Sequence, residues 1–76
     1  MPITGYTKHG INSAINHNNF GVSQTSILNT VINPIQTIQQ ANGVTKFVGV
    51  DSVVILNSSG KVITTWPTSS GAYRIP

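Results

Sequence analysis

Apolar residues before Pro34 have the spacing of amphipathic helices. Ile11, Ala14 and Ile15 recur three and four positions apart and predict the buried stripe of a first helix over residues 7–16, with Thr7 as a suitable N-cap. The turn-forming residues 17–21 then end this helix. A second stripe on the same helix is entirely polar and consists of His9, Asn12, Ser13 and Asn16.

A second helix is predicted to begin after Ser23, because serine is a favoured N-cap. Val22 before the cap and Ile27 at the fourth helical position are placed to form a hydrophobic staple. Asn33 ends the helix, since a residue before proline avoids the helical conformation. The buried face is expected to consist of Ile27, Leu28, Val31 and Ile32.

After Pro34 the chain consists of short segments rich in Val, Ile and Thr, which favour strands. Asn42-Gly43 is a strong hairpin sequence, and Ser58-Ser59-Gly60 marks a second turn. We therefore predict an α+β fold with two N-terminal helices packed on a twisted antiparallel sheet of about four strands, which leaves the other face to water or a ligand. The expected strands are 35–40, 44–50, 52–57 and 61–66.

A length of 76 residues allows one small domain. We expect a single domain over 1–76, divided into a lead-in (1–6), a helical part (7–33), the sheet (35–66) and an irregular tail (67–76). No apolar run approaches the roughly 20 residues that span a bilayer, so no stable membrane insertion is expected. The first residues also lack the pattern of a secretory signal.

Composition excludes several chemistries. Asp51 is the only acidic residue, and there are two histidines and no cysteine. A catalytic carboxylate pair, a carboxylate cage for Ca²⁺ or Mg²⁺, a thiolate zinc site and a disulfide framework are therefore excluded, and we expect neither metal nor cofactor. The formal charge of +3 favours an anionic partner, either nucleic acid or an acidic protein, although it also serves solubility.

Two groups of residues suggest phosphate chemistry. His9, beside Lys8, falls in the first turn of the first helix, where unpaired backbone N–H groups favour phosphate and an imidazole can exchange a proton near neutral pH. The alternative is an ordinary surface histidine, which is also how we interpret His17. Lys46 lies within a strand, where it either neutralises a phosphate or protects a sheet edge.

The segment 64–74 is dense in hydrogen-bond donors that suit a phosphodiester and bases. Arg74 can bind phosphate through two parallel hydrogen bonds, and Trp66 and Tyr73 can stack on bases, although a tryptophan in so small a domain can equally pack in the core. By strand alternation, Thr64 shares a face with Val62 and Trp66. Without carboxylates or metal, such a set fits RNA cleavage in which the 2′-OH of the RNA is the nucleophile.

Several sequence blocks resemble a family of bacterial toxins: the C-terminal toxin domains of polymorphic and contact-dependent growth inhibition systems, with a barnase/EndoU/colicin/RelE-like ribonuclease fold and colicin D as a relative in kind. The likeness runs from Lys8 to Arg74. The blocks are Lys8-His9-Gly10-Ile11-Asn12, Phe20-Gly21-Val22-Ser23, Ile27-Leu28-Asn29-Thr30-Val31, Thr45-Lys46-Phe47-Val48-Gly49, Val53-Val54-Ile55-Leu56-Asn57, Gly60-Lys61-Val62-Ile63-Thr64-Thr65-Trp66 and Ala72-Tyr73-Arg74.

The resemblance implies cleavage of RNA, usually tRNA, in the cytoplasm of a target bacterium by the C-terminal part of a larger exported toxin. It implies a cognate immunity protein, expected to be acidic, that covers the active cleft. His9 would be the general acid/base, and Lys46 and Thr65 would contact the scissile phosphate with help from Arg74. Further substrate contacts are expected from Lys8, Asn12, Trp66, Thr68 and Tyr73.

Two other functions fit the same residues. A non-catalytic nucleic-acid-binding module would need only the basic residues and the aromatics, and would not depend on His9. A protein-interaction module from a larger surface protein would suit the neutral polar composition. The RNA that is cut, any host activating factor and the delivery polypeptide are open at this point.

Overall fold

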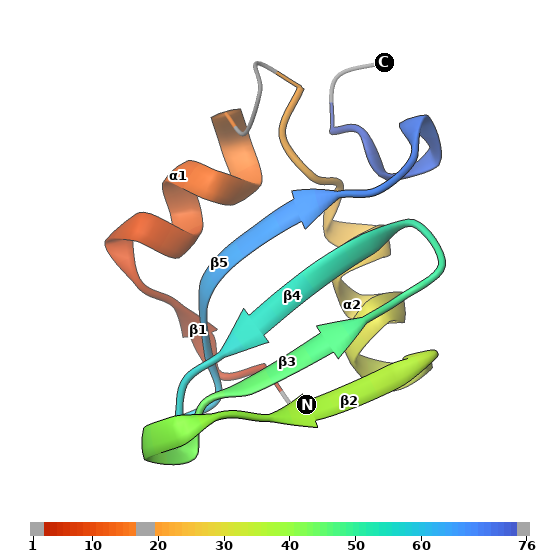
Figure 1. Cartoon of the computed structure of the whole chain (residues 1–76). Helices are drawn as coiled ribbons and strands as arrows, with labels where there is room; N and C mark the ends of the chain where they lie inside the picture. The colour runs from red at the N-terminus through yellow and green to blue at the C-terminus, as the bar shows by residue number, and fades with distance from the viewer. Residues whose placement is uncertain (1–2, 17–19, 75–76) are drawn as a thin grey trace.

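A computed structural model describes residues 3–16 and 20–74. In these residues the chain forms two helices and a five-stranded mixed sheet with strand order β1-β5-β4-β3-β2, which confirms the predicted α+β class (Figure 1). Two short 3₁₀ turns, η2 (Ala41–Gly43) and η3 (Ser70–Ala72), complete the structure. The main elements are β1 (Gly5–Tyr6), α1 (Lys8–Asn16), α2 (Gln24–Ile32), β2 (Gln36–Gln39), β3 (Thr45–Val48), β4 (Ser52–Leu56) and β5 (Lys61–Pro67).

The four predicted strands form the expected antiparallel meander. Its first hairpin turn contains Asn42 at φ 61° and Gly43 at φ 75°, the left-handed backbone that an Asn-Gly pair adopts easily. Val48 and Val53 are paired across the next connection, so that turn is tight as well. Both predicted turns therefore connect strands that pair with each other in the sheet.

The N-terminal segment differs from the prediction. Residues 1–6 were expected to lead into the first helix, but Gly5 and Tyr6 form β1, which pairs in parallel with Lys61 and Val62 of β5. Thr7 N donates to Val62 O at 3.0 Å and so continues this contact. The expectation of four strands, all antiparallel and all after the helices, is therefore wrong. A two-residue strand is too short to show a periodicity of its own.

The start of α2 forms as predicted. Ser23 adopts an extended conformation and its side chain accepts a hydrogen bond from Ser26 N at 3.2 Å. Val22 and Ile27 on either side of this cap are both buried, as a hydrophobic staple requires. The helix ends at Ile32, directly before Asn33, also as predicted.

The buried face of α2 is not the one that apolar spacing predicted. Ile32 is 57% exposed, whereas Thr30 is almost fully buried. The reason is a hydroxyl cluster with β4: Ser52 Oγ lies 2.9 Å from Ser26 Oγ and 2.6 Å from Thr30 Oγ1. These three side chains satisfy one another, so they can be buried without unpaired polar groups. The observed face therefore consists of Ser26, Ile27, Thr30 and Val31.

Helix α1 lies along the edge of β5 (Figure 1), and small residues make the contact. Gly10 and Ser13 are its buried residues, while Ile11 is 45% and Ile15 38% exposed, so the predicted apolar stripe is not the buried one. A Cβ atom on Gly10 would lie 1.9 Å from Val62 O, which means that only glycine permits this approach. Ser13, predicted as part of a polar surface, lies against Thr64.

The hydrophobic core lies between α2 and the sheet. Side chains alternate along a strand, so Val54 and Leu56 of β4 face α2 while Val53 and Ile55 face away. A β-bulge opposite Ile55 and Leu56 then brings Val62 of β5 into the core. The described helices leave the opposite sheet face, which we call the open face, uncovered (Figure 1).

Candidate nucleic-acid interface

The open face carries a cation beside an aromatic ring. Lys46 Nζ lies 5.7 Å from the centre of the Trp66 ring, within the range of a cation–π contact. Both side chains are half-buried. The register explains the contact: Lys46 is paired with Ile55 and Ile55 with Thr64, so these residues form one row across the open face. Trp66 lies two residues further along β5, on the same face.

The polar flank of α1 borders the open face. Ser13 Oγ lies 3.3 Å from Thr64 Oγ1, at the end of the row that contains Lys46. His9 is one helical turn before Ser13 and therefore lies on the same side of α1, where it is exposed. Two strand spacings, about 10 Å, separate Lys46 from the strand that α1 contacts. An extended phosphodiester chain on the open face can thus approach both residues.

The predicted substrate-contacting residues of α1 are accessible. Lys8 and Asn12 are both exposed. Lys8 begins α1, whose first turn also includes His9. His17 lies outside the described residues, so its predicted inertness stays a prediction.

Thr65 does not lie where the sequence prediction placed it. Its side chain is completely buried and its hydroxyl donates to Val53 O at 2.7 Å. Thr65 is paired with Val54, a core residue, so it faces α2 rather than the open face. A contact with a scissile phosphate is incompatible with this burial. The accessible hydroxyl on the open face belongs to its neighbour Thr64. Strand alternation predicted that Thr64 shares a face with Trp66, but Thr64 was not assigned to the site.

The remaining predicted residues lie in the segment after β5. Thr68 is exposed, and its N–H donates to Asp51 O at 2.7 Å. The carboxylate of Asp51 accepts a hydrogen bond from Ser69 at 2.7 Å, so the single acidic residue of the chain holds this segment against the turn between β3 and β4. Tyr73 stacks on Phe20 with ring centres 4.4 Å apart and planes 6° from parallel. This face of Tyr73 is therefore already occupied.

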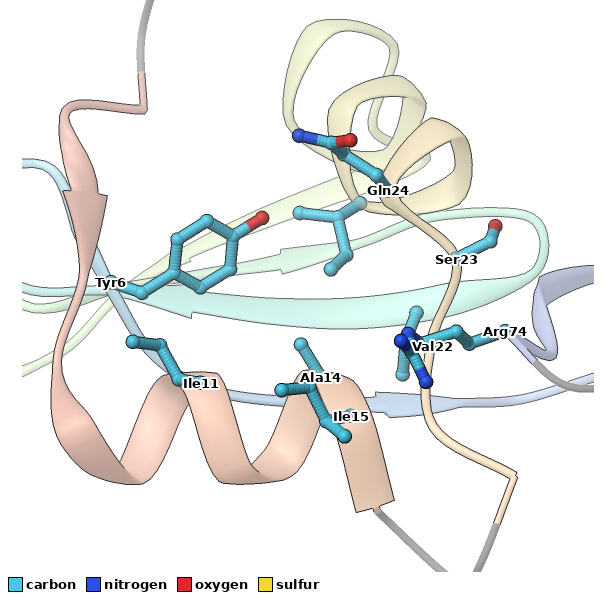
Figure 2. A pocket seen from close by; sticks show the side chains of 9 residues that line it. Tyr6, Ile11, Ala14, Ile15, Val22, Ser23, Gln24 and Arg74 are labelled. Carbon is cyan, nitrogen blue, oxygen red and sulfur yellow. The ribbon is translucent and has the colours of Figure 1, made fainter.

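Arg74 lines a cleft on the other side of α1, between this helix and the start of α2 (Figure 2). The cleft has a volume of about 430 Å³ and is walled largely by aliphatic side chains, with Tyr6 on one side and Arg74 on the other. Burial raises the pKa of the Tyr6 hydroxyl above its usual value. Sequence reasoning missed this cleft because it assigned Ile11 and Ile15 to the core. The predicted set of residues is thus divided between two surfaces.

Two further features concern metals and membranes. Within residues 3–16 and 20–74 no three His, Cys, Asp or Glu side chains gather into a group that could hold a metal ion. In the same part of the chain, no helix has both the length and the apolar character that a membrane span needs.

Comparison with known proteins gives one informative similarity. The chain is 47% identical over 70 residues to the tRNA nuclease WapA of Bacillus subtilis (strain 168). The match covers 91% of this chain but 3% of that protein, so the chain corresponds to a small part of a much longer polypeptide. No family model matches the chain, and no solved structure matches it. Identity at this level over nearly the whole chain indicates that the two segments are homologous.

Proposed function

We propose that this chain is a ribonuclease domain that cleaves tRNA, and that it acts as the toxic part of a larger exported protein. The observation that carries the proposal is the 47% identity with a protein named as a tRNA nuclease, over 91% of the chain. The open face supports it independently, because Lys46 supplies a cation, Trp66 an aromatic surface and His9 a proton-transfer group at its border.

The proposed reaction uses the 2′-OH of the RNA as the nucleophile, and it needs from the protein only side chains that this chain contains. The 2′-oxygen of the RNA forms a bond to phosphorus while the bond from phosphorus to the 5′-oxygen breaks. His9 takes the proton from the 2′-OH and returns a proton to the 5′-oxygen, which gives a 2′,3′-cyclic phosphate and a 5′-OH. We assign proton transfer to His9 and stabilisation of the negative charge on the phosphoryl oxygens to the Lys46 ammonium. DNA lacks the 2′-OH and would be spared.

The wider biological setting belongs to the same proposal. We place the domain, over 1–76, among the barnase/EndoU/colicin/RelE-like toxins of contact-dependent and polymorphic systems, acting in the cytoplasm of a competing bacterium. The chain has four basic residues and one acidic residue, and the resulting net positive charge suits an acidic immunity protein. Helix α2 on one side of the sheet, α1 along its edge and an uncovered opposite face are compatible with this fold.

A non-catalytic nucleic-acid-binding module is the second candidate. It is favoured by one observation: the residues predicted to act together lie on two surfaces, with Lys46 on the open face and Arg74 in the cleft. Such a module would keep RNA affinity without His9. A protein-interaction module would need neither Lys46 nor His9.

The deciding experiment is incubation of the purified chain with total bacterial RNA in EDTA, resolved on a denaturing gel. We expect discrete tRNA fragments ending in a 2′,3′-cyclic phosphate. His9→Ala should lower the rate by about 10²–10⁴-fold. Lys46→Gln should lower it as well, whereas Lys61→Gln, which removes the same charge from an exposed lysine at the start of β5, should not.

Each outcome separates the candidates. Bound but uncut RNA, with affinity unchanged in His9→Ala, would assign the chain as a binding module. Equal cleavage by the parent and His9→Ala would remove His9 from the mechanism while retaining the nuclease. Activity that EDTA abolishes and Mg²⁺ restores would refute a metal-independent mechanism.

A further inference from the structure

The cleft between α1 and the start of α2 has two apolar walls. Ile11, Ala14 and Ile15 project from α1, and Val22 lies opposite them in the segment that leads into α2 (Figure 2). Ile27, within α2, also lines the cleft. Ile11 and Ile15 remain substantially exposed. A volume of about 430 Å³ lies within the range of small-molecule sites. The cleft is therefore large enough for one nucleotide.

Polar groups line the same cleft. Three of them are the Tyr6 hydroxyl, the Gln24 amide and the Arg74 guanidinium; a fourth, the Ser23 hydroxyl, already accepts a hydrogen bond from Ser26 N. Among residues 3–16 and 20–74, no side-chain hydrogen bond joins any of the three to another residue. Donors and acceptors that border an apolar slot and bond to no other residue of the described chain are available to a ligand that has apolar faces and a polar edge.

We propose that this cleft binds one nucleoside monophosphate unit of RNA, with the base between the aliphatic walls and the phosphate on Arg74. The inference rests on the proposed function, because RNA is the substrate that would supply the nucleotide. A planar heterocycle presents two apolar faces to the walls and a hydrogen-bonding edge to Tyr6 and Gln24. The fixed fork of an arginine guanidinium matches two phosphate oxygens. A purely aliphatic ligand would leave all three polar groups unused.

The position of the cleft gives it a role in substrate selection. Helix α1 carries His9 on one flank and Ile11, Ala14 and Ile15 on the other, and an α-helix with its side chains is about 10–12 Å across. One RNA strand that crosses α1 can place one nucleotide in the cleft and another on the open face. The cleft would then select which phosphodiester reaches His9.

Nuclear magnetic resonance titration of the ¹⁵N-labelled chain with AMP, GMP, CMP and UMP tests the inference, because a monophosphate contains no bond that the proposed reaction can cleave. We expect saturable shifts at the amides of Tyr6, Ala14, Ile15 and Gln24 with at least one nucleotide. Ala14→Leu should weaken its binding roughly tenfold or more by filling the cleft. Thr25→Leu, which adds bulk at an exposed position of α2, should leave binding unchanged.

Arg74→Gln provides a second, independent variant. It should weaken binding of the monophosphate roughly tenfold but leave binding of the parent nucleoside unchanged. Gln24→Ala, at an exposed position, replaces Ala14→Leu if that variant fails to fold. Shifts confined to the amides around Lys46 and Trp66 would overturn the inference. Equal affinity for inorganic phosphate, or saturation by an acidic leucine-containing peptide and not by nucleotides, would also overturn it.

The inference and the proposed function can fail separately. Cleavage of tRNA without nucleotide binding in the cleft would refute the inference and leave the nuclease intact. Nucleotide binding in the cleft without cleavage of any RNA would refute the nuclease and retain the cleft as a nucleotide site.

Discussion

Substitution of Gly10 by alanine tests how closely α1 approaches the sheet. An added Cβ atom would lie 1.9 Å from Val62 O and 2.7 Å from Val62 C, both backbone atoms that no rotamer change can move. An ordinary contact of 3.4 Å requires α1 to move away by about 1.5 Å. Such a displacement would break the 3.0 Å hydrogen bond from Thr7 N to Val62 O.

Two effects of opposite sign determine the result. Alanine favours a helix over glycine by about 1 kcal/mol. Overpacking costs about 1–3 kcal/mol and a lost hydrogen bond about 1 kcal/mol, so the losses should exceed the gain. We expect Gly10→Ala to lower the free energy of unfolding by about 1–3 kcal/mol. Because α1 also carries His9, this displacement should lower the proposed tRNA cleavage by about 10²-fold.

Urea denaturation followed by circular dichroism measures the stability, and the RNA gel measures cleavage. Asn12→Ala is the matched control for stability, since Asn12 is exposed on the same helix and its substitution changes propensity without a clash. A Gly10→Ala protein as stable as Asn12→Ala would refute the close contact between α1 and β5. Unchanged cleavage in a destabilised variant would instead show that the position of α1 does not control the reaction.

Three further predictions concern buried groups. Ser52→Ala removes the hydroxyl that partners Thr30 and should lower the free energy of unfolding by about 1–3 kcal/mol in urea titrations; no change would mean that the cluster contributes little. Thr65→Val leaves Val53 O without its side-chain donor and should cost about 1 kcal/mol, with cleavage per folded molecule unchanged; a large loss of cleavage would return Thr65 to the site. Burial raises the pKa of Tyr6 above 10.0, so the unfolded chain loses this proton first as pH rises. The stability that Tyr6 confers is therefore complete below pH 10 and lost as pH rises through the higher folded value. Melting temperatures between about pH 8 and pH 12 should fall less steeply for Tyr6→Phe, and identical slopes would contradict the burial effect.

The candidate site shows where residue type was informative and where geometry was needed. Lys46, His9 and Trp66 were predicted from their chemistry. The structure places Lys46 in contact with Trp66, and His9 borders the same face of the sheet. Thr65 was assigned to the site through the family resemblance, but its pairing with Val54 places its side chain in the core. The β-bulge at Ile55 and Leu56 adds a residue to β5. For that reason Val62, predicted to share a face with Trp66, enters the core instead.

The cleft could not be predicted, because it depends on a contact between distant segments. The sequence pattern assigned Ile11 and Ile15 to the core, because the apolar stripe of a helix is usually buried. Because Gly10 packs against Val62, the face of α1 that contacts the sheet is not the apolar stripe. Ile11 and Ile15 instead line an open cleft together with Arg74. A single glycine within a helix gives no sequence pattern from which a close contact between that helix and a strand could be predicted.

The sequence by itself determined the order and type of most elements, because caps, turns and strand propensity act between neighbouring residues. Ser23, Asn33-Pro34 and Asn42-Gly43 set boundaries that the structure keeps. Composition likewise excluded a cysteine-based or carboxylate-pair site in the printed chain. The tertiary structure alone decided which faces are buried, because burial depends on partners far along the chain. That is why the short strand β1, the hydroxyl cluster on Ser52 and the division of the candidate residues between two surfaces emerged only from the folded molecule.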